Sequence, residues 1–276
     1  MPAYNAGDRI RSTIKSLGAN SEPFDLFIVD DGSQPPLSET MGAPPPNAKI
    51  LRLDQNVGIA AALNHGLTEI LKHDYTYVAR MDVGDIAHPD RFAKQVAFLQ
   101  SHPEIGLVGC WISFVDENSR ESLFHLNHPT TDADIRDALH FNLCITHAAM
   151  MFRTDAIRAI GGYSTEFPIC EDYEIVLRLA QIAKMANIPE YLMECELGAG
   201  GLSIRKRRTQ QFSRLRLQVR HLQPLQRHSW LGIIRSLVLL ISPTKLLHNI
   251  KGRLKKYHPI DTSGNTMSNQ PGQPDK

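Results

Sequence analysis

Two carboxylates stand three residues apart in the stretch RMDVGDIAHPDRF, which spans residues 80–92. Asp82 and Asp85 follow an apolar, strand-like run and precede a helix. From such a position their oxygens can hold a hard divalent cation such as Mg²⁺ or Mn²⁺. Aspartate and glycine also favour ordinary solvated turns. The stretch by itself therefore leaves a metal site and a plain turn open.

Acidic or amide-rich segments also follow other strand-like runs. Asp30 and Asp31 come directly after FDLFIV, and Asn56 and Gly58 precede a helix within NVGIAAALNHG. Ligands of α/β proteins bind at the carboxyl ends of strands, and the N-terminus of a helix favours anions. The first pair also fits a simple Asp-Gly turn. The second segment is not G-x-G-x-x-G, so a dinucleotide site has little support.

A fourth acidic segment, CEDYE, places Glu171 and Asp172 at the start of a predicted helix. A carboxylate in this position can act as a general base if it is held beside a substrate hydroxyl. It can equally be a favourable partner of the helix dipole without any catalytic role. Both interpretations stay open at this point.

The pattern of apolar residues predicts elements that would bring these segments together. Apolar residues at helical spacing, or in short runs bounded by turns, alternate along the first half of the chain. We predict helices at 8–18, 61–71, 89–103 and 171–183, and strands at 24–29, 49–53, 75–80, 105–115 and 142–152. This β-α-β alternation predicts an α/β domain with a mostly parallel sheet flanked by helices.

Charge and cysteine content narrow the class of protein. The segment 197–260 carries Lys and Arg but no Asp or Glu, whereas the body before it is acidic. Nucleic-acid binding would suit a uniformly basic chain, so we expect no nucleic-acid partner. Four cysteines without a C-x-x-C pair indicate reduced thiols. The turn-forming PAYNAG after Met1 lacks the features of a signal peptide, so we expect a cytoplasmic body.

The basic segment contains the apolar run WLGIIRSLVLLIS at 230–242. Thirteen residues are too few to cross a bilayer, which needs about 20. A helix lying in the interface could bury its apolar face while Arg and Lys meet anionic lipid. Covering the main core, or forming a dimer contact, is the alternative. We expect a domain at 1–200, a basic amphipathic helical region at 201–258 and disorder at 259–276.

Six segments in order resemble the nucleotide-diphospho-sugar glycosyltransferases of the GT-A fold, specifically the inverting family 2. They are PAYNAG, VDDGS, NVGIAAALNHG, ARMDVGDIAHPDRF, ITHAAMMFR and GGYSTEFPICEDYEIVLRLA, and together they cover residues 1 to about 195. The resemblance implies transfer of a sugar, with inversion, from a nucleotide donor to a glycan or lipid-linked acceptor. It also implies a role in surface polysaccharide assembly, at the inner face of the cell membrane.

The resemblance further implies roles for individual residues. The donor would contact Pro2, Tyr4, Asn5, Asp30, Asp31, Asn56, Gly58, Asp82 and His147. A divalent cation, Mg²⁺ or Mn²⁺, would be held by Asp82 and Asp85 on the diphosphate, where it stabilises the leaving group. Asp172 would be the base, and Glu171 would position the acceptor or tune that base. A core histidine with satisfied hydrogen bonds is the rival interpretation of His147.

Two departures from the family pattern affect this interpretation. Gly84 occupies the second acidic position of the usual Asp-x-Asp motif, which removes one potential metal ligand. Only Met1 precedes Pro2, where the family has an apolar first strand. We therefore expect unpaired strand edges and a gap in the core, and hypothesise that the natural protein begins earlier. A noncatalytic sugar-nucleotide-binding or scaffold protein is the alternative function, and a metal-dependent phosphohydrolase using Asp82 and Asp85 is a third.

Overall fold

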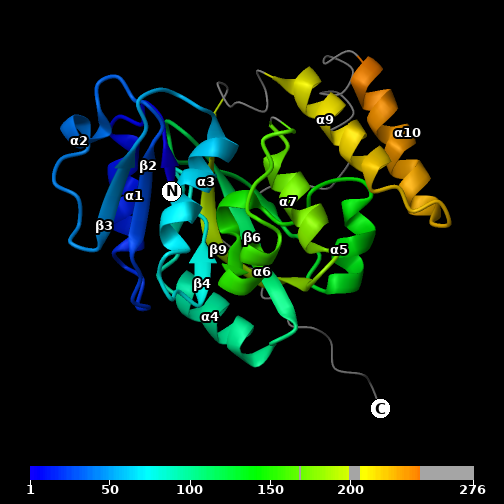
Figure 1. Ribbon diagram of the computed structural model, residues 1–276, viewed down its shortest axis with the longest axis horizontal. Helices are drawn as coiled ribbons and strands as arrows, with labels where there is room; N and C mark the ends of the chain where they lie inside the picture. The colour runs from blue at the N-terminus through cyan, green and yellow to red at the C-terminus, as the bar shows by residue number, and fades with distance from the viewer. Residues whose placement is uncertain (168, 199–205, 243–276) are drawn as a thin grey trace.

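The computed structural model describes residues 1–167, 169–198 and 206–242. Two sheets form the centre of the molecule, with helices packed around them (Figure 1). The expected disorder at 259–276, and part of the predicted basic region 201–258, lie outside the described residues.

The smaller sheet is fully parallel, as the β-α-β alternation predicts. It has the order β1-β2-β3, with β1 at Pro2–Ala3, β2 at Leu26–Asp30 and β3 at Ala48–Arg52. The connecting helices are α1 (Arg9–Leu17), α2 (Leu37–Thr40) and α3 (Ile59–Ile70). Parallel strands require such crossovers, since a tight turn cannot join them.

The larger sheet differs from the predicted mostly parallel arrangement. Its order is β4-β8-β6-β9-β5, with β7 also paired to β6. Only β6 and β9 run parallel, and every other pair is antiparallel. The strands are β4 (Tyr77–Ala79), β5 (Ile86–Ala87), β6 (Ile105–Asp116), β7 (Ser122–Leu126), β8 (Met151–Arg153) and β9 (Lys184–Leu197).

Two local features explain part of this difference. A turn joins β6 directly to β7, in which Asp116 Oδ1 accepts hydrogen bonds from the backbone N–H groups of Asn118 and Ser119, each at 2.9 Å. Such a hairpin makes antiparallel neighbours. The strand predicted at 142–152 is also shorter than expected. Residues 147–149 form a 3₁₀ turn, so the strand begins only at Met151.

The remaining helices cover the sheets and complete two apolar clusters. They are α4 (Arg91–Ser101), α5 (Asp132–Leu139), α6 (Thr154–Ala159), α7 (Glu171–Leu179), α9 (Arg207–Arg220) and α10 (Arg227–Ile241). One cluster joins α1 and α4 to the strands through Leu17, Ile28 and Phe92. The other joins α3 and α7 through Leu67 and Val176. None of the described helices is long and apolar enough to cross a membrane.

The expected gap near the start of the chain is present in the fold. The first strand is not absent but reduced to two residues, which pair with Val29 and Asp30 of β2. Beyond Met1 no described strand lies between β2 and β4, and the two sheets are separate. A cavity of about 300 Å³ lies between them.

Candidate active site

Asp31 shapes one wall of the site by holding the loop before α3. Its Oδ1 accepts from the Val57 N–H at 2.8 Å, and its Oδ2 accepts from the Gly58 N–H at 3.1 Å and from Asn56 Nδ2 at 3.0 Å. Gly58 adopts φ +87°, a conformation that favours glycine. The Asp31 carboxylate therefore brings together three of the predicted residues: Asp31 itself, Asn56 and Gly58.

Asp30 is equally engaged, but with its own turn. Its side chain accepts hydrogen bonds from the backbone N–H groups of Ser33 (2.9 Å) and Leu37 (3.0 Å) and pairs with Arg52. Burial disfavours the charged form, yet these partners lower the pKa of Asp30 below its ordinary value. Asp30 is thus an ionised, internally satisfied group that fixes the β2 turn.

The loop after β1 closes the same end of the small sheet. Asn5 donates its backbone N–H to Ser33 Oγ and accepts from the Gln34 N–H, both at 2.9 Å. Tyr4 is 53% exposed beside it, and Pro2 lies in β1 opposite Val29. The structure brings together the donor-binding residues predicted in the first 58 positions, at the carboxyl ends of β1 to β3 (Figure 1).

A second group of polar side chains surrounds Arg80, which is 4% exposed. Its guanidinium donates to Asp82 Oδ1 at 2.7 Å, to His147 Nε2 at 3.2 Å and to the Met81 carbonyl at 2.8 Å. The Tyr163 hydroxyl lies 2.9 Å from the same His147 nitrogen. Asp82 and His147, far apart in sequence, are therefore joined through Arg80.

The charges of this group follow from its burial. Burial first, and then the Arg80 charge, lower the pKa of His147 to about 3, so the imidazole is neutral near pH 7. Burial would raise the pKa of Asp82, but the Arg80 guanidinium outweighs it and the pKa of Asp82 is lowered. A buried, neutral histidine that contacts Arg80 and Tyr163 agrees with the core-histidine interpretation, and its contact with Arg80 also places it beside Asp82.

Glu171 and Asp172 begin α7 and lie close to this group. Asp172 Oδ1 accepts from the Tyr173 N–H at 2.7 Å, whereas Glu171 Oε2 is buried without a hydrogen-bond partner among the described residues. Burial, and then the neighbouring Asp172 charge, raise the pKa of Glu171 to about 7. Burial likewise raises the pKa of Asp172. Such a carboxyl pair can accept a proton near neutral pH.

Tyr163 connects the two groups in space. Burial is the main reason why the pKa of its hydroxyl is raised, and the charges of Asp82, Glu171 and Asp172 raise it further, while Arg80 opposes them. All of these charges therefore lie within electrostatic reach of one hydroxyl. The predicted catalytic pair and Asp82 therefore lie around Tyr163.

Sequence reasoning missed three residues of this region: Arg80, Tyr163 and Arg214. Arg214 reaches the site from α9, where its charge acts to lower the pKa of Asp172 and its Nε has no hydrogen-bond partner within the described ranges. Arg80 and Tyr163 lie within the segments that resemble the family, but their burial is visible only in the structure, since arginine is rarely buried. For Arg214 no local motif provides a signal.

The metal pair Asp82 and Asp85 stays a prediction, and the structure shows how each of the two carboxylates is held. Asp85 is 7% exposed and turns inward, where its Oδ1 accepts from the Glu196 N–H at 2.9 Å. Burial, and then Asp82, raise the pKa of Asp85 to about 7. Within the described ranges no three His, Cys, Asp or Glu side chains group around a potential cation. Asp82 keeps one oxygen outside its Arg80 pair, so it fits a cation held by one carboxylate and by donor phosphates.

Gly84 contributes to this arrangement. A Cβ at this position would lie 2.1 Å from Glu196 Oε2, so the place of a second acidic side chain is filled. Glu196 is itself paired with Arg9 and Arg120. The charge of Glu196 is therefore offset by two guanidinium groups, and it does not replace the missing metal ligand.

Comparison with known proteins decides the family. Residues 1–161 match the family described as Glycosyl transferase family 2. The chain belongs to this family. It is 34% identical over 202 residues to an uncharacterized glycosyltransferase of Haemophilus influenzae, covering 71% of this chain and 73% of the relative. It is 32% identical over 206 residues to the amylovoran biosynthesis glycosyltransferase AmsE of Erwinia amylovora, covering 72% and 73%. The protein is thus a glycosyltransferase.

Solved structures agree on the fold. The TarS fragment 1–349 of S. aureus in complex with UDP-GlcNAc gives a TM-score of 0.62 at 17% identity, covering 86% of this chain and 70% of that one. The mannosyltransferase PcManGT of Pyrobaculum calidifontis in complex with GDP-Man and Mn²⁺ gives 0.58 at 14% identity, covering 87% and 68%. The predicted GT-A fold is confirmed, with the larger sheet mixed rather than mostly parallel.

Proposed function

We propose that this glycosyltransferase moves a sugar, with inversion, from a nucleotide-diphosphate donor to a hydroxyl of a glycan or lipid-linked acceptor. The observation that carries the proposal is the pair Glu171 and Asp172 at the start of α7, whose pKa values are raised and whose charges act on Tyr163 together with the charge of Asp82. A carboxylate whose pKa approaches neutrality suits a general base. Names of the relatives, such as amylovoran biosynthesis and O-antigen biosynthesis, support a role in surface polysaccharide assembly.

The donor would lie across the carboxyl ends of β1 to β3. The exposed Tyr4 ring offers a surface for the base. The loop that Asp31 holds presents the start of α3, whose N-terminal N–H groups favour phosphate. In this arrangement Asp30, Asp31 and Asn5 act by fixing the loops around the nucleotide.

Inversion requires the acceptor oxygen to attack the anomeric carbon on the face opposite the departing nucleoside diphosphate. The new C–O bond forms as the bond to the diphosphate oxygen breaks, and Asp172 takes the hydroxyl proton. Glu171, one residue earlier and also buried, raises the proton affinity of the pair through like-charge repulsion. Arg80 donates to both His147 and Asp82, and so would hold these two side chains in place beside the diphosphate.

A divalent cation would be held through Asp82 and the donor phosphates. When bound, it would offset the negative charge that develops on the leaving diphosphate. Asp85 takes no part in this proposal, because its carboxyl group is buried against the backbone of Glu196.

Donor turnover tests the proposal. The protein would be incubated with UDP-, GDP- and dTDP-sugars, with Mn²⁺, Mg²⁺ or EDTA, and with glycan or lipid-linked diphosphate acceptors. We expect release of one nucleotide, and loss of that release in Asp172→Asn but not in Asp137→Asn, whose carboxylate is 66% exposed. Tight, metal-indifferent donor binding without turnover would instead support the scaffold alternative.

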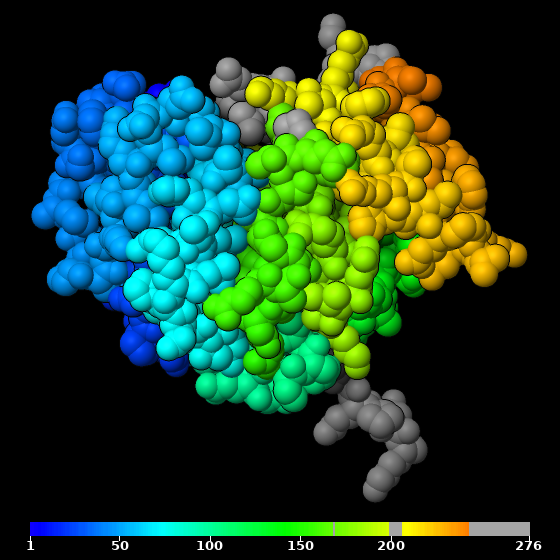
Figure 2. All heavy atoms as spheres, viewed as in Figure 1, coloured from blue at the N-terminus to red at the C-terminus, as the bar shows by residue number. Residues whose placement is uncertain are grey.

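We further propose that α10 holds the protein against an anionic membrane surface. Ser229, Gly232 and Ser236 are buried against the body, and a Cβ at Gly232 would lie 1.8 Å from the His140 carbonyl. Six large apolar residues of the helix lie on its outer face, and each is 45% exposed or more: Trp230, Leu231, Ile234, Leu237, Val238 and Ile241. Figure 2 shows α9 and α10 as one block at the edge of the molecule.

Interfacial binding fits this helix better than a role in covering the core. Its fully buried residues are small, and six of its large apolar residues are exposed, whereas a core-covering helix buries its large apolar residues. Exposed basic residues Lys206, Arg208 and Arg227 flank it and would meet anionic headgroups.

Vesicle flotation tests membrane attachment. We expect the full chain to float with vesicles containing anionic lipid, and the double variant Leu231→Asp, Ile234→Asp to remain in the lower fraction. Ile182→Asp, at a 55% exposed site outside α10, is the matched control and should float. Equal flotation of all three proteins would contradict the proposal, and a dimer that dissociates in the double variant would identify the face as a contact between copies.

A further inference from the structure

An aromatic cluster lies on the larger sheet, where β6 pairs with β7 on one side and with β9 on the other. The ring centroids of Trp111 and Tyr191 are 5.5 Å apart, and those of His125 and Tyr191 are 4.4 Å apart. Tyr191 is 39% exposed. We propose that these three rings, the aromatic platform, stack against a sugar ring of the acceptor glycan. The inference rests on the proposed function, because it specifies the chemistry of the acceptor.

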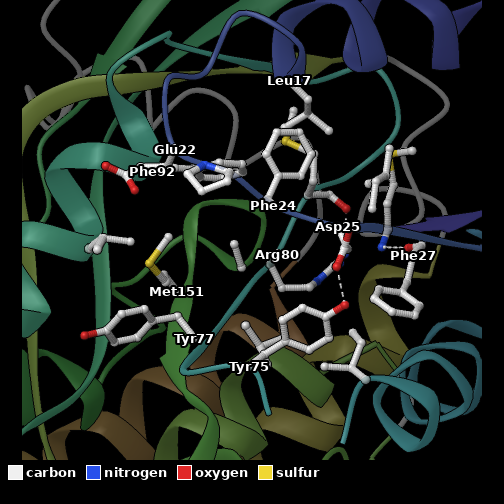
Figure 3. A pocket seen from close by; sticks show the side chains of 18 of the residues that line it. Leu17, Glu22, Phe24, Asp25, Phe27, Tyr75, Tyr77, Arg80, Phe92 and Met151 are labelled. Carbon is white, nitrogen blue, oxygen red and sulfur yellow. Dashed lines mark hydrogen bonds between the residues drawn. The ribbon is translucent and has the colours of Figure 1, made fainter. Parts of the chain in front are cut away.

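Hydrogen bonds fix two of the three rings. The Trp111 Nε1–H donates to the His128 carbonyl at 2.9 Å, and the Tyr191 hydroxyl donates to Asn127 Oδ1 at 2.7 Å. A ring that is already fixed loses little conformational entropy when a ligand stacks on it. The cavity between the two sheets is a separate feature with its own aromatic lining, which includes Phe92 (Figure 3).

The polar groups beside the rings suit sugar hydroxyls. Ser113 Oγ lies 2.9 Å from His125 Nδ1, and Asn127 is exposed next to Tyr191. Glu194 lies opposite Ser113 in the β6–β9 register, and its side chain is 52% exposed. Hydroxyl, amide and carboxylate groups all form hydrogen bonds with hydroxyls. The C–H face of a pyranose ring packs on the electron-rich face of an aromatic ring. The platform therefore offers both kinds of surface that a sugar needs.

The charges beside the platform disfavour a nucleotide as its ligand. Nucleobases also stack on aromatic rings, but a nucleotide brings phosphates with it. The nearby Arg120 guanidinium already pairs with Glu194 at 3.4 Å and with Glu196 at 2.7 Å. It also donates to the Gly84 carbonyl at 3.2 Å. A phosphate would have to displace a carboxylate from Arg120 and would meet the negative charge of that carboxylate. A neutral sugar requires no such exchange.

A chain of contacts joins the platform to the candidate active site. His128, whose carbonyl accepts from Trp111, also has its Nε2 2.8 Å from Thr146 Oγ1. Thr146 directly precedes His147, whose ring contacts Tyr163. A sugar on the platform would consequently lie beside the segment that carries His147, close to where the acceptor hydroxyl would react.

The platform and the predicted catalytic pair are also on the same side of the larger sheet. Gly109 and Trp111 share one face of β6, because side chains alternate along a strand. A Cβ at Gly109 would lie 2.6 Å from Ile145 Cγ2, and Ile145 packs in the apolar cluster that includes Val176 of α7. Trp111 therefore lies on the α7 side of the sheet, and α7 carries the catalytic pair at its start.

Tryptophan fluorescence tests sugar binding without any turnover. The chain has two tryptophans, so Trp230→Phe leaves Trp111 as the single emitter. This protein would be titrated with lactose, cellobiose, maltose and N,N′-diacetylchitobiose, with glycerol as the control polyol. We expect a saturable change in Trp111 emission with at least one disaccharide. We expect none with glycerol, because glycerol lacks a ring face that could stack.

Substitutions of Tyr191 in the same protein connect that binding to the platform. Tyr191→Ala removes a ring and should weaken sugar binding about three- to tenfold. Tyr191→Leu keeps apolar bulk without an aromatic face and should weaken it likewise, whereas Tyr191→Phe keeps the ring and should bind as the parent does. Phe212→Ala, at a 54% exposed site on α9, is the matched control and should leave the affinity unchanged.

Three results would overturn the inference. The absence of a saturable response to every disaccharide would show that Trp111 is not at a sugar site. Equal affinities of the parent, Tyr191→Ala and Tyr191→Leu, even with lowered melting temperatures, would show that the rings only stabilise the sheet. Tighter binding of UMP with the same dependence on Tyr191 would assign the platform to a nucleobase. Sugar binding that depends on Tyr191, in a protein that turns over no donor, would contradict the proposed function and leave the platform in place.

Discussion

The two carboxylate pairs of this glycosyltransferase differ in how their oxygens are satisfied. Asp30 and Asp31 receive hydrogen bonds from six donors, and the pKa of Asp30 is lowered. Glu171 is buried and Asp172 is half-buried, both have few hydrogen-bond donors around them, and their pKa values are raised. Two neighbouring carboxylates that follow a strand or begin a helix can therefore have different roles, and their place in the sequence does not decide which. A satisfied pair shapes loops, whereas an under-satisfied pair is suited to moving a proton.

The largest expected effect is on turnover in Asp172→Asn. Removal of a general base lowers the rate by about 10²–10⁴-fold. Because the charged form of Asp172 is disfavoured in the fold, the variant should be at least as stable as the wild type. Steady-state donor turnover and thermal unfolding check both statements. If Asp172→Asn kept a tenth or more of the wild-type turnover, Asp172 would not be the general base.

The next effect is on stability in Asp31→Ala. This change leaves three hydrogen-bond donors of the 56–58 loop without their acceptor. It should therefore lower the free energy of unfolding, measured by urea denaturation, by about 2–4 kcal/mol. Asp54→Ala, at an exposed site on the following strand end, is the control and should stay within about 0.5 kcal/mol. If Asp31→Ala lost no more free energy of unfolding than Asp54→Ala, Asp31 would not be a structural group, and the difference between the two carboxylate pairs would not hold.

A third effect is the pH dependence of stability. The pKa of Glu171 is about 7 in the fold against 4.5 ordinarily, so its contribution is fully present below about pH 4.5 and is lost as the pH rises through 7. The slope reaches at most about 1.4 kcal/mol per pH unit. Glu171→Gln should flatten the stability curve of the wild type between these values. Parallel curves for the two proteins would show that the pKa of Glu171 is not raised.

The smallest effect is expected at Asp85. Its carboxyl group is buried, its pKa is raised to about 7, and asparagine has nearly its shape, so Asp85→Asn should leave the Mn²⁺ dependence of turnover unchanged. Asp82→Asn should weaken that dependence, because Asp82 is the carboxylate left for the donor's cation. Turnover measured over a range of Mn²⁺ concentrations distinguishes the two variants. A loss in Asp85→Asn equal to that in Asp82→Asn would restore the predicted two-aspartate metal site.

The sequence predicted two of the three strands of the small parallel sheet, β2 and β3, because each is followed by a short-range signal such as VDDG or NVG. It predicted the larger sheet poorly. Strand β9 contains Pro189 and several charged residues, and its pairing with β6 joins segments far apart in the chain. Long-range pairing of this kind depends on tertiary packing, which local propensity does not report.

The site shows the same division. Asp82, His147, Glu171 and Asp172 were predicted from the order of their segments, and in the structure all four lie around Tyr163. Whether a carboxylate is satisfied was not readable in the sequence, because the donors to Asp31 come from a loop 25 to 27 positions away. The inward turn of Asp85 likewise depends on Glu196, which is 111 positions away.

The central claim is that the two carboxylate pairs have opposite electrostatic environments. Carboxyl carbon chemical shifts, followed by NMR from pH 3 to pH 9 in one ¹³C-labelled sample, test it directly. We expect Asp30 to titrate below its ordinary value of 3.8 and Glu171 to titrate at about 7, with Asp172 also above its ordinary value. Titration of Glu171 and Asp172 together with the exposed carboxylates, near 4, would contradict the account.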